Sequence, residues 1–225
     1  MKIVKFNKDK YPFDKLVSSL YNCDLNQLND NKDYTYLDNK SLFTKENVGK
    51  DSDSIFHKVF YDKLREGWPE LIHLYEEFLI KEIGILFKEE EEIIYQKTPS
   101  YRVNQPGGKA VYIAHSDGDK NHNHPSGEIN IFLPLTKAYG NNTIWVESIP
   151  GLGDYSPIEI KFGEFLMFYG NKLRHFNKIN NTGETRCSFD FRIIPPVNYD
   201  DSYKGGSAIL GKEFLVGGYY KKIKK

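Results

Sequence analysis

The sequence is poor in several features whose presence would point to particular protein classes. It has two cysteines, Cys23 and Cys187, which excludes a disulfide framework and a Cys-based zinc module. Lysine plus arginine and aspartate plus glutamate each number 31. A zero net charge argues against nucleic-acid or membrane-surface binding that rests on bulk charge. No apolar run approaches the length of a membrane helix, and the N-terminus lacks a signal-peptide core. We therefore expect a cytoplasmic protein with reduced thiols.

Aromatic residues, by contrast, are abundant. They make up 15% of the 225 residues, and most are tyrosine or phenylalanine. Rings of this kind favour strands and line clefts. The length suits one domain with a helical extension and a sizeable core.

Helical spacing of apolar residues dominates the first part of the chain. It predicts helices in three segments: 12–21, 54–65 and 70–88. The polar segment 24–54 is expected to be a loop, and Asp53 or Ser54 can cap the helix that follows it. We therefore predict that residues 1–98 form a helical region that packs on the rest of the protein.

Residues 99–200 change to the two-residue period of β-strands. Strands are predicted in six segments: 109–115, 128–135, 143–149, 158–160, 164–168 and 186–194. Glycine, proline and asparagine clusters separate them, which favours a mainly β jelly roll or barrel. Residues 201–225 are expected to be an extension that wraps the surface and is partly disordered.

His115 and Asp117 stand two residues apart at the end of a predicted strand, and His175 follows 58 residues after Asp117. Residues two apart on a strand point to the same side, and His175 is expected to begin the opposite strand. Two imidazoles and one carboxylate form the facial triad that binds non-haem Fe(II) and leaves coordination positions open. We therefore predict that these three residues are the catalytic metal ligands. The alternative is a chance cluster that binds no metal.

Other polar side chains near the triad are candidates for substrate contacts. His122 and His124 lie in the loop 120–127 and compete as ligands. Histidines of a loop beside an open site more often line the substrate entrance than bind the metal, so we assign both to substrate binding. Arg102 and Lys109, which precede the triad, are candidate contacts to substrate or cosubstrate.

The strand that begins at Arg186 carries the candidate cosubstrate site. Arg186 lies 11 residues after His175, with Ser188 on the same face. An arginine with a neighbouring hydroxyl suits a buried carboxylate, and many facial-triad enzymes hold the far carboxylate of 2-oxoglutarate with a basic residue at this distance. Arg192, 17 residues after His175, is the alternative candidate for binding this carboxylate. Asn130, between apolar neighbours, needs a partner, either the cosubstrate or a neighbouring strand. The alternative for the Arg186 strand is that its charged face meets solvent.

Three blocks of the sequence resemble StrG-type proteins, which are found with streptomycin and surface-polysaccharide biosynthesis genes. The blocks are His115-Ser-Asp117, His124-Pro-Ser-Gly-Glu-Ile-Asn-Ile-Phe-Leu-Pro-Leu-Thr136, and His175 with Arg186-Cys-Ser-Phe-Asp-Phe-Arg-Ile-Ile-Pro195. That family looks like a branch of the cupin-fold Fe(II)/2-oxoglutarate dioxygenases. The resemblance covers about residues 99–200 and implies a double-stranded β-helix, with Fe(II) on the triad.

The resemblance also implies 2-oxoglutarate contacts from Arg186, Ser188 and Asn130. The expected activity is a dioxygenase that hydroxylates or oxidises a small molecule such as a sugar, nucleotide sugar or glycan precursor. One alternative is another cupin enzyme, such as a sugar epimerase or isomerase, and a second is a metal-free protein that only binds carbohydrate. Arg186 with Ser188 argues against the first, and an intact triad argues against the second.

Overall fold

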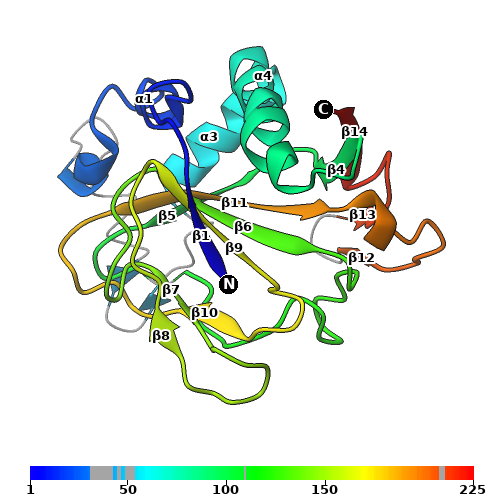
Figure 1. Ribbon diagram of the computed structural model, residues 1–225. Helices are drawn as coiled ribbons and strands as arrows, with labels where there is room; N and C mark the ends of the chain where they lie inside the picture. Colours follow the sequence, from blue (N-terminus) through cyan, green and yellow to red (C-terminus); the bar gives the residue numbers. More distant parts are fainter. Residues whose placement is uncertain (31–42, 45–46, 49–53, 109, 208–210) are drawn as a thin grey trace.

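A large antiparallel sheet runs through the centre of the molecule (Figure 1). The computed structural model describes residues 1–30, 43–44, 47–48, 54–108, 110–207 and 211–225. Within these, the sheet has the order β1 (Lys2–Lys5), β9 (Glu164–Phe168), β6 (Ile129–Pro134), β11 (Arg186–Ile194), β4 (Glu92–Gln96) and β14 (Tyr220–Lys224), and β5 (Ser100–Asn104) also pairs with β11. The nine-residue β11 pairs with β4, β5 and β6, so it is the central strand.

A smaller sheet lies below the large one in Figure 1. Its order is β10 (His175–Asn177), β7 (Ile144–Val146) and β8 (Ser156–Pro157). An apolar cluster includes side chains of both sheets: Phe132, Ala138, Ile144, Val146, Ile160, Leu166, Phe168 and Leu173. Two short pairs, β2 (Phe43–Thr44) with β3 (Asn47–Val48) and β12 (Gly206–Ser207) with β13 (Lys212–Glu213), lie outside both sheets. Two facing antiparallel sheets make the jelly roll that the strand pattern predicts.

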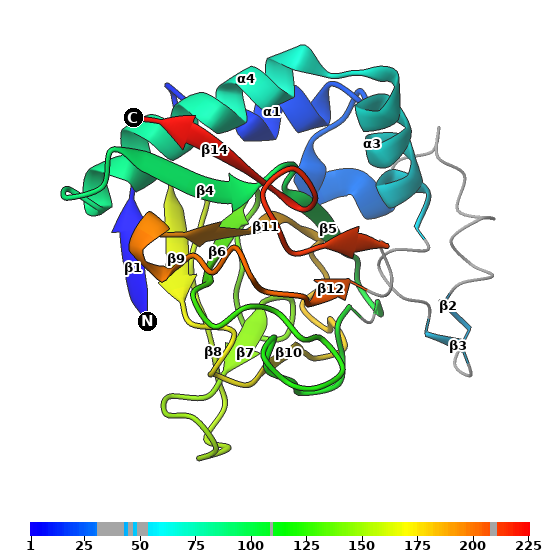
Figure 2. The same cartoon turned by 90° about the vertical axis from the view of Figure 1, so that its right-hand side faces the viewer.

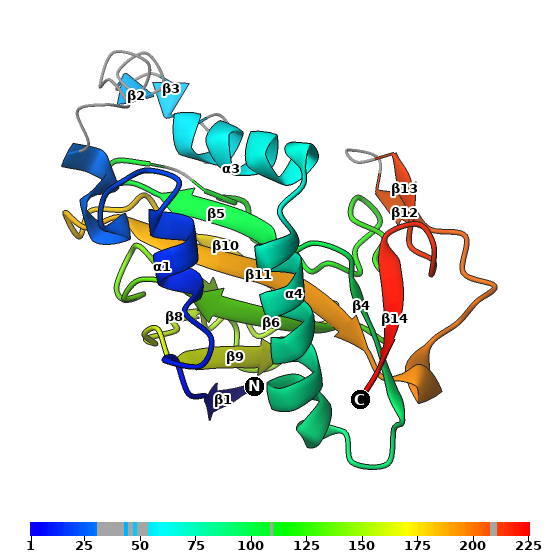
Figure 3. The same ribbon diagram turned by 90° about the horizontal axis from the view of Figure 1, so that it is seen from above.

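Helices cover the other face of the large sheet (Figures 2 and 3). They are α1 (Phe13–Ser18), α3 (Ile55–Glu66) and α4 (Pro69–Phe78), which continues as a π-helical turn (Leu79–Ile83) and a 3₁₀ turn (Gly84–Leu86). A separate 3₁₀ helix spans Leu25–Asp30. The Ser54 hydroxyl caps α3 by accepting the His57 amide at 3.1 Å, and Pro69 opens α4, where no amide hydrogen is needed. No helix of the described residues is both long and apolar enough to span a bilayer.

The side chains of β11 alternate between the core under the helices and the face that looks toward the smaller sheet. Four of its apolar side chains belong to the main core with the helices: Cys187, Phe189, Phe191 and Ile193. The intervening residues Arg186, Ser188, Asp190 and Arg192 share the opposite face, which looks toward the smaller sheet. Arg186 and Ser188 are 1% and 0% exposed, so the alternative that this face meets solvent is wrong. A row of buried polar side chains inside the jelly roll indicates a functional site on this face of β11.

Most of the predicted strands of the core are present, although some are shorter. The predictions for β6, β9 and β11 are confirmed. Residues 143–149 form only the three-residue β7, and 158–160 contribute only an isolated bridge at Ile160. The predicted strand at 109–115 is wrong for 110–114, because only His115 forms a β-bridge there, while Lys109 lies outside the described residues.

Four strands of the large sheet come from segments without a predicted strand: β1, β4, β5 and β14. The helical prediction for residues 1–98 is wrong for β1 and β4, and the prediction that the C-terminal extension only wraps the surface is wrong for β14. β1 and β14 are the two edges of the sheet and rich in lysine, as is common for edge strands that must not recruit other chains. Residues 31–42, 45–46 and 49–53 of the predicted loop, and 208–210 of the extension, lie outside the described residues.

Candidate metal centre

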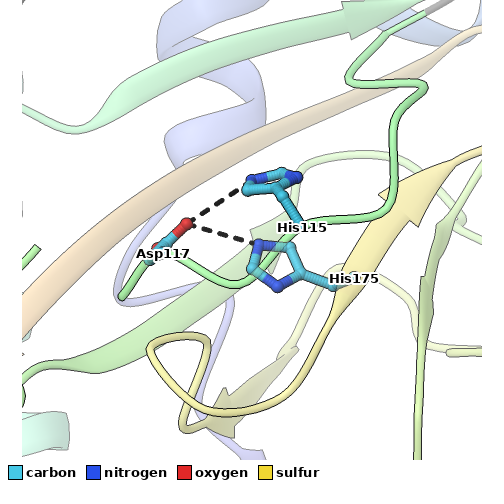
Figure 4. Close-up of side chains that lie close together, drawn as sticks. All are labelled: His115, Asp117 and His175. Carbon is cyan, nitrogen blue, oxygen red and sulfur yellow. Dashed lines mark ion pairs between the residues drawn. The ribbon is translucent and has the colours of Figure 1, made fainter. Parts of the chain in front are cut away.

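The three predicted metal ligands lie together and point toward one another (Figure 4). Nε2 of His115 and Nε2 of His175 are 3.5 and 3.6 Å from Oδ1 of Asp117. All three donor atoms lie within 4.8 Å of one another. Imidazole and carboxylate ligands bind a metal at about 2.0–2.2 Å, so these separations fit neighbouring ligands of one ion.

Both imidazoles are oriented by the backbone. Nδ1 of His115 lies 2.9 Å from the carbonyl oxygen of Ile113, and Nδ1 of His175 lies 3.0 Å from that of Leu173. A carbonyl requires that Nδ1 donate its hydrogen, which makes Nε2 the metal-binding atom of each ring. The tautomer that the metal needs is therefore set by the fold.

Asp117 is buried, and its two carboxylate oxygens have different surroundings. Oδ2 accepts hydrogen bonds from Nδ2 of Asn130 at 2.7 Å and from the Arg192 guanidinium at 2.7 and 3.2 Å. Oδ1 faces the two histidines. One oxygen is thus occupied by protein donors, while the other is directed at the metal position.

The protonation states of Asp117 and His175 suit metal binding. Burial raises the pKa of Asp117, but the charge of Arg192 and the nearby His115 outweigh it and hold this pKa well below its usual range. Burial lowers the pKa of His175 to about 4. For His115, burial lowers the pKa, but the contacts with Asp117 and the Ile113 carbonyl raise it above the usual value. At neutral pH Asp117 is a carboxylate and His175 a neutral imidazole, the forms that bind metal.

A cavity opens from the triad between the two sheets. Its walls combine apolar and polar side chains: Arg102, Val111, His115, Asp117, Asn130, Ile131, Phe132, Ile144, Phe168, His175, Phe176, Asn177, Asp190, Phe191 and Arg192. Rings and aliphatic side chains with a few convergent polar groups are typical of small-molecule sites.

Arg186 lies next to this cavity. Its Nε donates to the carbonyl oxygen of Asn142 at 2.9 Å, and Nη1 donates to the Ser188 hydroxyl at 2.8 Å. The ring of Phe132, which lines the cavity, lies 5.6 Å from the guanidinium carbon. Arg186 and Ser188 therefore form one buried unit behind Phe132, and neither is among the residues that line the cavity.

The other predicted site residues have different surroundings. The amide of Asn130 and the guanidinium of Arg192 both contact the candidate metal ligand Asp117. Arg102 lines the cavity, with Nε 3.5 Å from Oδ2 of Asp190. Asp190 was not anticipated as a cavity residue, although the alternation of its strand placed it on the same face as Arg186.

The two loop histidines lie around the triad and not in the cavity wall. The ring of His122 stacks on that of His115, with 4.2 Å between centroids, and its Nδ1 is 2.9 Å from Oδ1 of Asp119. Nδ1 of His124 is 2.9 Å from Oε2 of Glu128. Glu128 is fully buried. No local pattern predicts this burial, because it depends on Tyr220, which is distant along the chain.

Comparison with known proteins finds a relative of similar length. No family model matches the chain. The streptomycin biosynthesis protein StrG of Streptomyces griseus is 32% identical over 173 residues, which are 76% of this chain and 77% of that protein. EctD from S. alaskensis, solved with 2-oxoglutarate and 5-hydroxyectoine, covers 96% of this chain and 76% of its own, with 15% identity and a TM-score of 0.53.

A third similar protein is the non-haem alpha-ketoglutarate-dependent carbocyclase SnoK from nogalamycin biosynthesis. It covers 68% of this chain and 72% of its own, with 14% identity and a TM-score of 0.46. The likeness to EctD confirms the mainly β jelly-roll fold expected from the sequence.

Proposed function

The chain belongs to the StrG family, and from that premise we propose that it is an Fe(II)- and 2-oxoglutarate-dependent dioxygenase that acts on a small molecule. The observation that carries the proposal is the convergence of two imidazole nitrogens and one carboxylate oxygen beside a cavity between the sheets. This donor set is typical of non-haem Fe(II) oxygenases. EctD, which shares the fold, was solved with 2-oxoglutarate, which supports the choice of cosubstrate.

His115, Asp117 and His175 would hold the metal through Nε2, Oδ1 and Nε2. Bound Fe(II) would supply the oxygen chemistry that oxidises a substrate C–H bond while 2-oxoglutarate becomes succinate and carbon dioxide. The protein's part is to fix the three donors, keep the imidazoles in the right tautomer and leave the other side of the ion open to the cavity.

Arg186 and Ser188 would bind the far carboxylate of 2-oxoglutarate. The Arg186 guanidinium donates to the Ser188 hydroxyl at 2.8 Å, and this hydroxyl donates to Oδ1 of Asp190 at 3.3 Å. These bonds hold a buried cation on the inner face of β11, where burial strengthens its attraction for a carboxylate. Arg192 is less suited to this role, because Asp117 already accepts two of its N–H groups. Asn130 donates to the same oxygen, so we assign it to the metal ligand and not to the cosubstrate.

The cavity walls would select and shield the substrate. The rings of Phe132 and Phe168 limit the access of water, while Arg102 and Asp190 offer a cation and an anion to polar groups. The relation to a streptomycin biosynthesis protein supports a sugar, nucleotide sugar or glycan precursor as substrate. The free thiols of Cys23 and Cys187 support a cytoplasmic location.

The test is to add Fe(II) and then 2-oxoglutarate to metal-free protein without oxygen, and to record the visible spectrum. We expect a weak charge-transfer band that needs both additions and is absent in His175→Ala. Failure to take up metal would overturn the proposal in favour of a protein that only binds carbohydrate. Metal uptake without the band would favour the epimerase or isomerase alternative.

A further inference from the structure

Arg192 connects the metal ligand Asp117 with a second group of buried polar side chains. Its Nε lies 3.6 Å from Oε2 of Glu128, and its Nη1 donates to the hydroxyl of Tyr219 at 3.4 Å. Glu128 is 0% exposed and Tyr219 is 6% exposed. The guanidinium is therefore in contact with protein acceptors beyond the Asp117 carboxylate.

Glu128 is itself fixed by further contacts. The hydroxyl of Tyr220 donates to its Oε1, and Nδ1 of His124 lies 2.9 Å from its Oε2. The ring of His124 packs on Phe214, with 4.1 Å between centroids. A buried carboxylate needs partners for its oxygens, and these contacts hold Glu128 next to Arg192.

The charges explain why the contact with Glu128 matters for Arg192. Burial lowers the pKa of Arg192, but Asp117 and the other acidic groups around it raise it well above the usual value, so the guanidinium stays cationic. A cation between two carboxylates is held from two sides, whereas a cation with Asp117 alone could move with that side chain. Glu128 and Tyr219 thus limit where the N–H groups of Arg192 can point.

The position of Arg192 decides how Asp117 binds metal. Its two N–H groups and the Asn130 amide together occupy Oδ2, so that only Oδ1 is offered to the metal. A carboxylate that binds through one oxygen uses one coordination position and leaves more positions open. Without Arg192 in place, Oδ2 could turn toward the ion and take a second position.

The C-terminal segment contributes Tyr219 and Tyr220 to the contacts around Arg192 and Glu128. Tyr220 begins β14, which pairs with β4 at the edge of the large sheet (Figure 2). Tyr219 precedes it and contacts Arg192, although the two are 27 residues apart. We propose that Glu128 and Tyr219 are positioning residues for the metal centre, which hold Arg192 on Oδ2 of Asp117 so that the C-terminal segment helps to set the metal affinity. This inference rests on the proposed metal-dependent function.

The experiment is a titration of the full-length, metal-free protein with Co(II), which reports both affinity and coordination number through its visible spectrum. The variants are Glu128→Gln, which keeps the shape and removes the charge, and Tyr219→Phe, which removes one hydroxyl. The control is Tyr199→Phe, the same change at a tyrosine whose hydroxyl accepts the Val216 amide at 3.0 Å and is not among the partners of Arg192. Thermal unfolding of each metal-free variant is measured in parallel.

We expect Glu128→Gln to weaken Co(II) binding on the order of 10-fold, as changes next to metal ligands do, with altered Co(II) band intensities. Tyr219→Phe should shift affinity in the same direction by a smaller factor, and Tyr199→Phe should bind as the wild type does. If Glu128→Gln does not fold, the Co(II) affinity and spectrum of Tyr219→Phe alone test the inference. Wild-type affinity and spectrum in the folded variants would overturn the inference and leave the metal centre intact, whereas no Co(II) binding by the wild type would overturn both.

Discussion

His115 and His175 form an isolated antiparallel bridge and exchange both of their backbone hydrogen bonds. The His115 amide donates to the His175 carbonyl at 3.2 Å, and the His175 amide donates to the His115 carbonyl at 2.8 Å. Residues paired in this way lie directly opposite each other, and their side chains leave the same face. The main chain itself therefore sets the spacing of the two imidazoles.

Replacing His175 with alanine should abolish metal binding without unfolding the protein. The backbone pair with His115 does not depend on the imidazole, so the fold should persist while one of three ligands is lost. We expect the affinity for Fe(II) or Co(II) to fall by more than the roughly 10–100-fold typical of changes beyond the ligands themselves. Titration and circular dichroism measure the two effects. His73→Ala, an exposed position on α4, is the control, and unchanged metal affinity in His175→Ala would exclude the triad.

Arg186→Lys and Arg192→Lys should have separable effects. Lysine keeps the charge of Arg186 but loses the planar pair of donors, so we expect 2-oxoglutarate to bind about 2 kcal/mol more weakly, or about 30-fold, with metal affinity unchanged. Arg192 contacts Asp117, so its replacement should first weaken metal binding. Anaerobic titration with each component measures both constants. The reverse pattern would move the cosubstrate site to Arg192.

The strands that carry the site could be predicted because their signal is local. On β11, apolar and polar residues alternate over nine positions, and this alone placed Arg186 and Ser188 on one face. The cluster of His115, Asp117 and His175 could likewise be predicted from residue types and spacing, because two imidazoles and a carboxylate in this pattern match the facial triad.

Other features depend on contacts that no local pattern records. β14 is a strand because it pairs with β4, and its own sequence, with three lysines among five residues, resembles a solvated tail. The buried state of Glu128 depends on Tyr220, which lies 92 residues away. Residues 110–114 are predicted to be part of a strand, yet only His115 next to them forms a β-bridge, with His175.

Gly170→Ala should lower both stability and metal affinity, although Gly170 is not one of the proposed metal ligands. A Cβ at Gly170 would lie 2.5–2.7 Å from the amide atoms of Asn130, and this amide is held by Asp117. Overpacking of this kind costs about 1–3 kcal/mol, and the displaced Asn130 should weaken metal binding as well. Thermal unfolding and Co(II) titration test this. Adding Asn130→Ala removes the clash, so stability should recover while metal affinity stays low; full affinity in Gly170→Ala would contradict the role given to Asn130.

Phe78→Ala should destabilise the fold more than any surface change on the same helical segment. The Phe78 ring is 0% exposed and makes edge contacts with four other rings: Phe6, Tyr11, Phe13 and Phe165. We expect the free energy of unfolding to fall by about 3–5 kcal/mol, measured by denaturant titration. Ile85→Ala, at a position that is 59% exposed, should change it by less than about 0.5 kcal/mol. Equal effects would show that the helices do not pack on the sheet as described.

Stability should fall steeply at alkaline pH. Burial raises the pKa of Tyr75 and Tyr101 well above 10, and it raises the pKa of the Cys187 thiol to about 12. Groups whose pKa is higher in the folded state bind protons more tightly there, so their contribution is complete below the unfolded pKa and is lost as pH rises through the folded one. Each such group removes up to about 1.4 kcal/mol per pH unit in that window.

The measurement is the ultraviolet absorbance of tyrosinate, followed together with circular dichroism from neutral pH upward. We expect exposed tyrosines to ionise while the fold is intact, and the buried ones to ionise only as it unfolds above about pH 10. Tyr101→Phe removes one of these groups and should flatten the fall in stability with pH, even if it lowers stability at neutral pH. Ionisation of every tyrosine in a still-folded protein would contradict the burial of Tyr75 and Tyr101, on which the packing of the helices against the sheet depends.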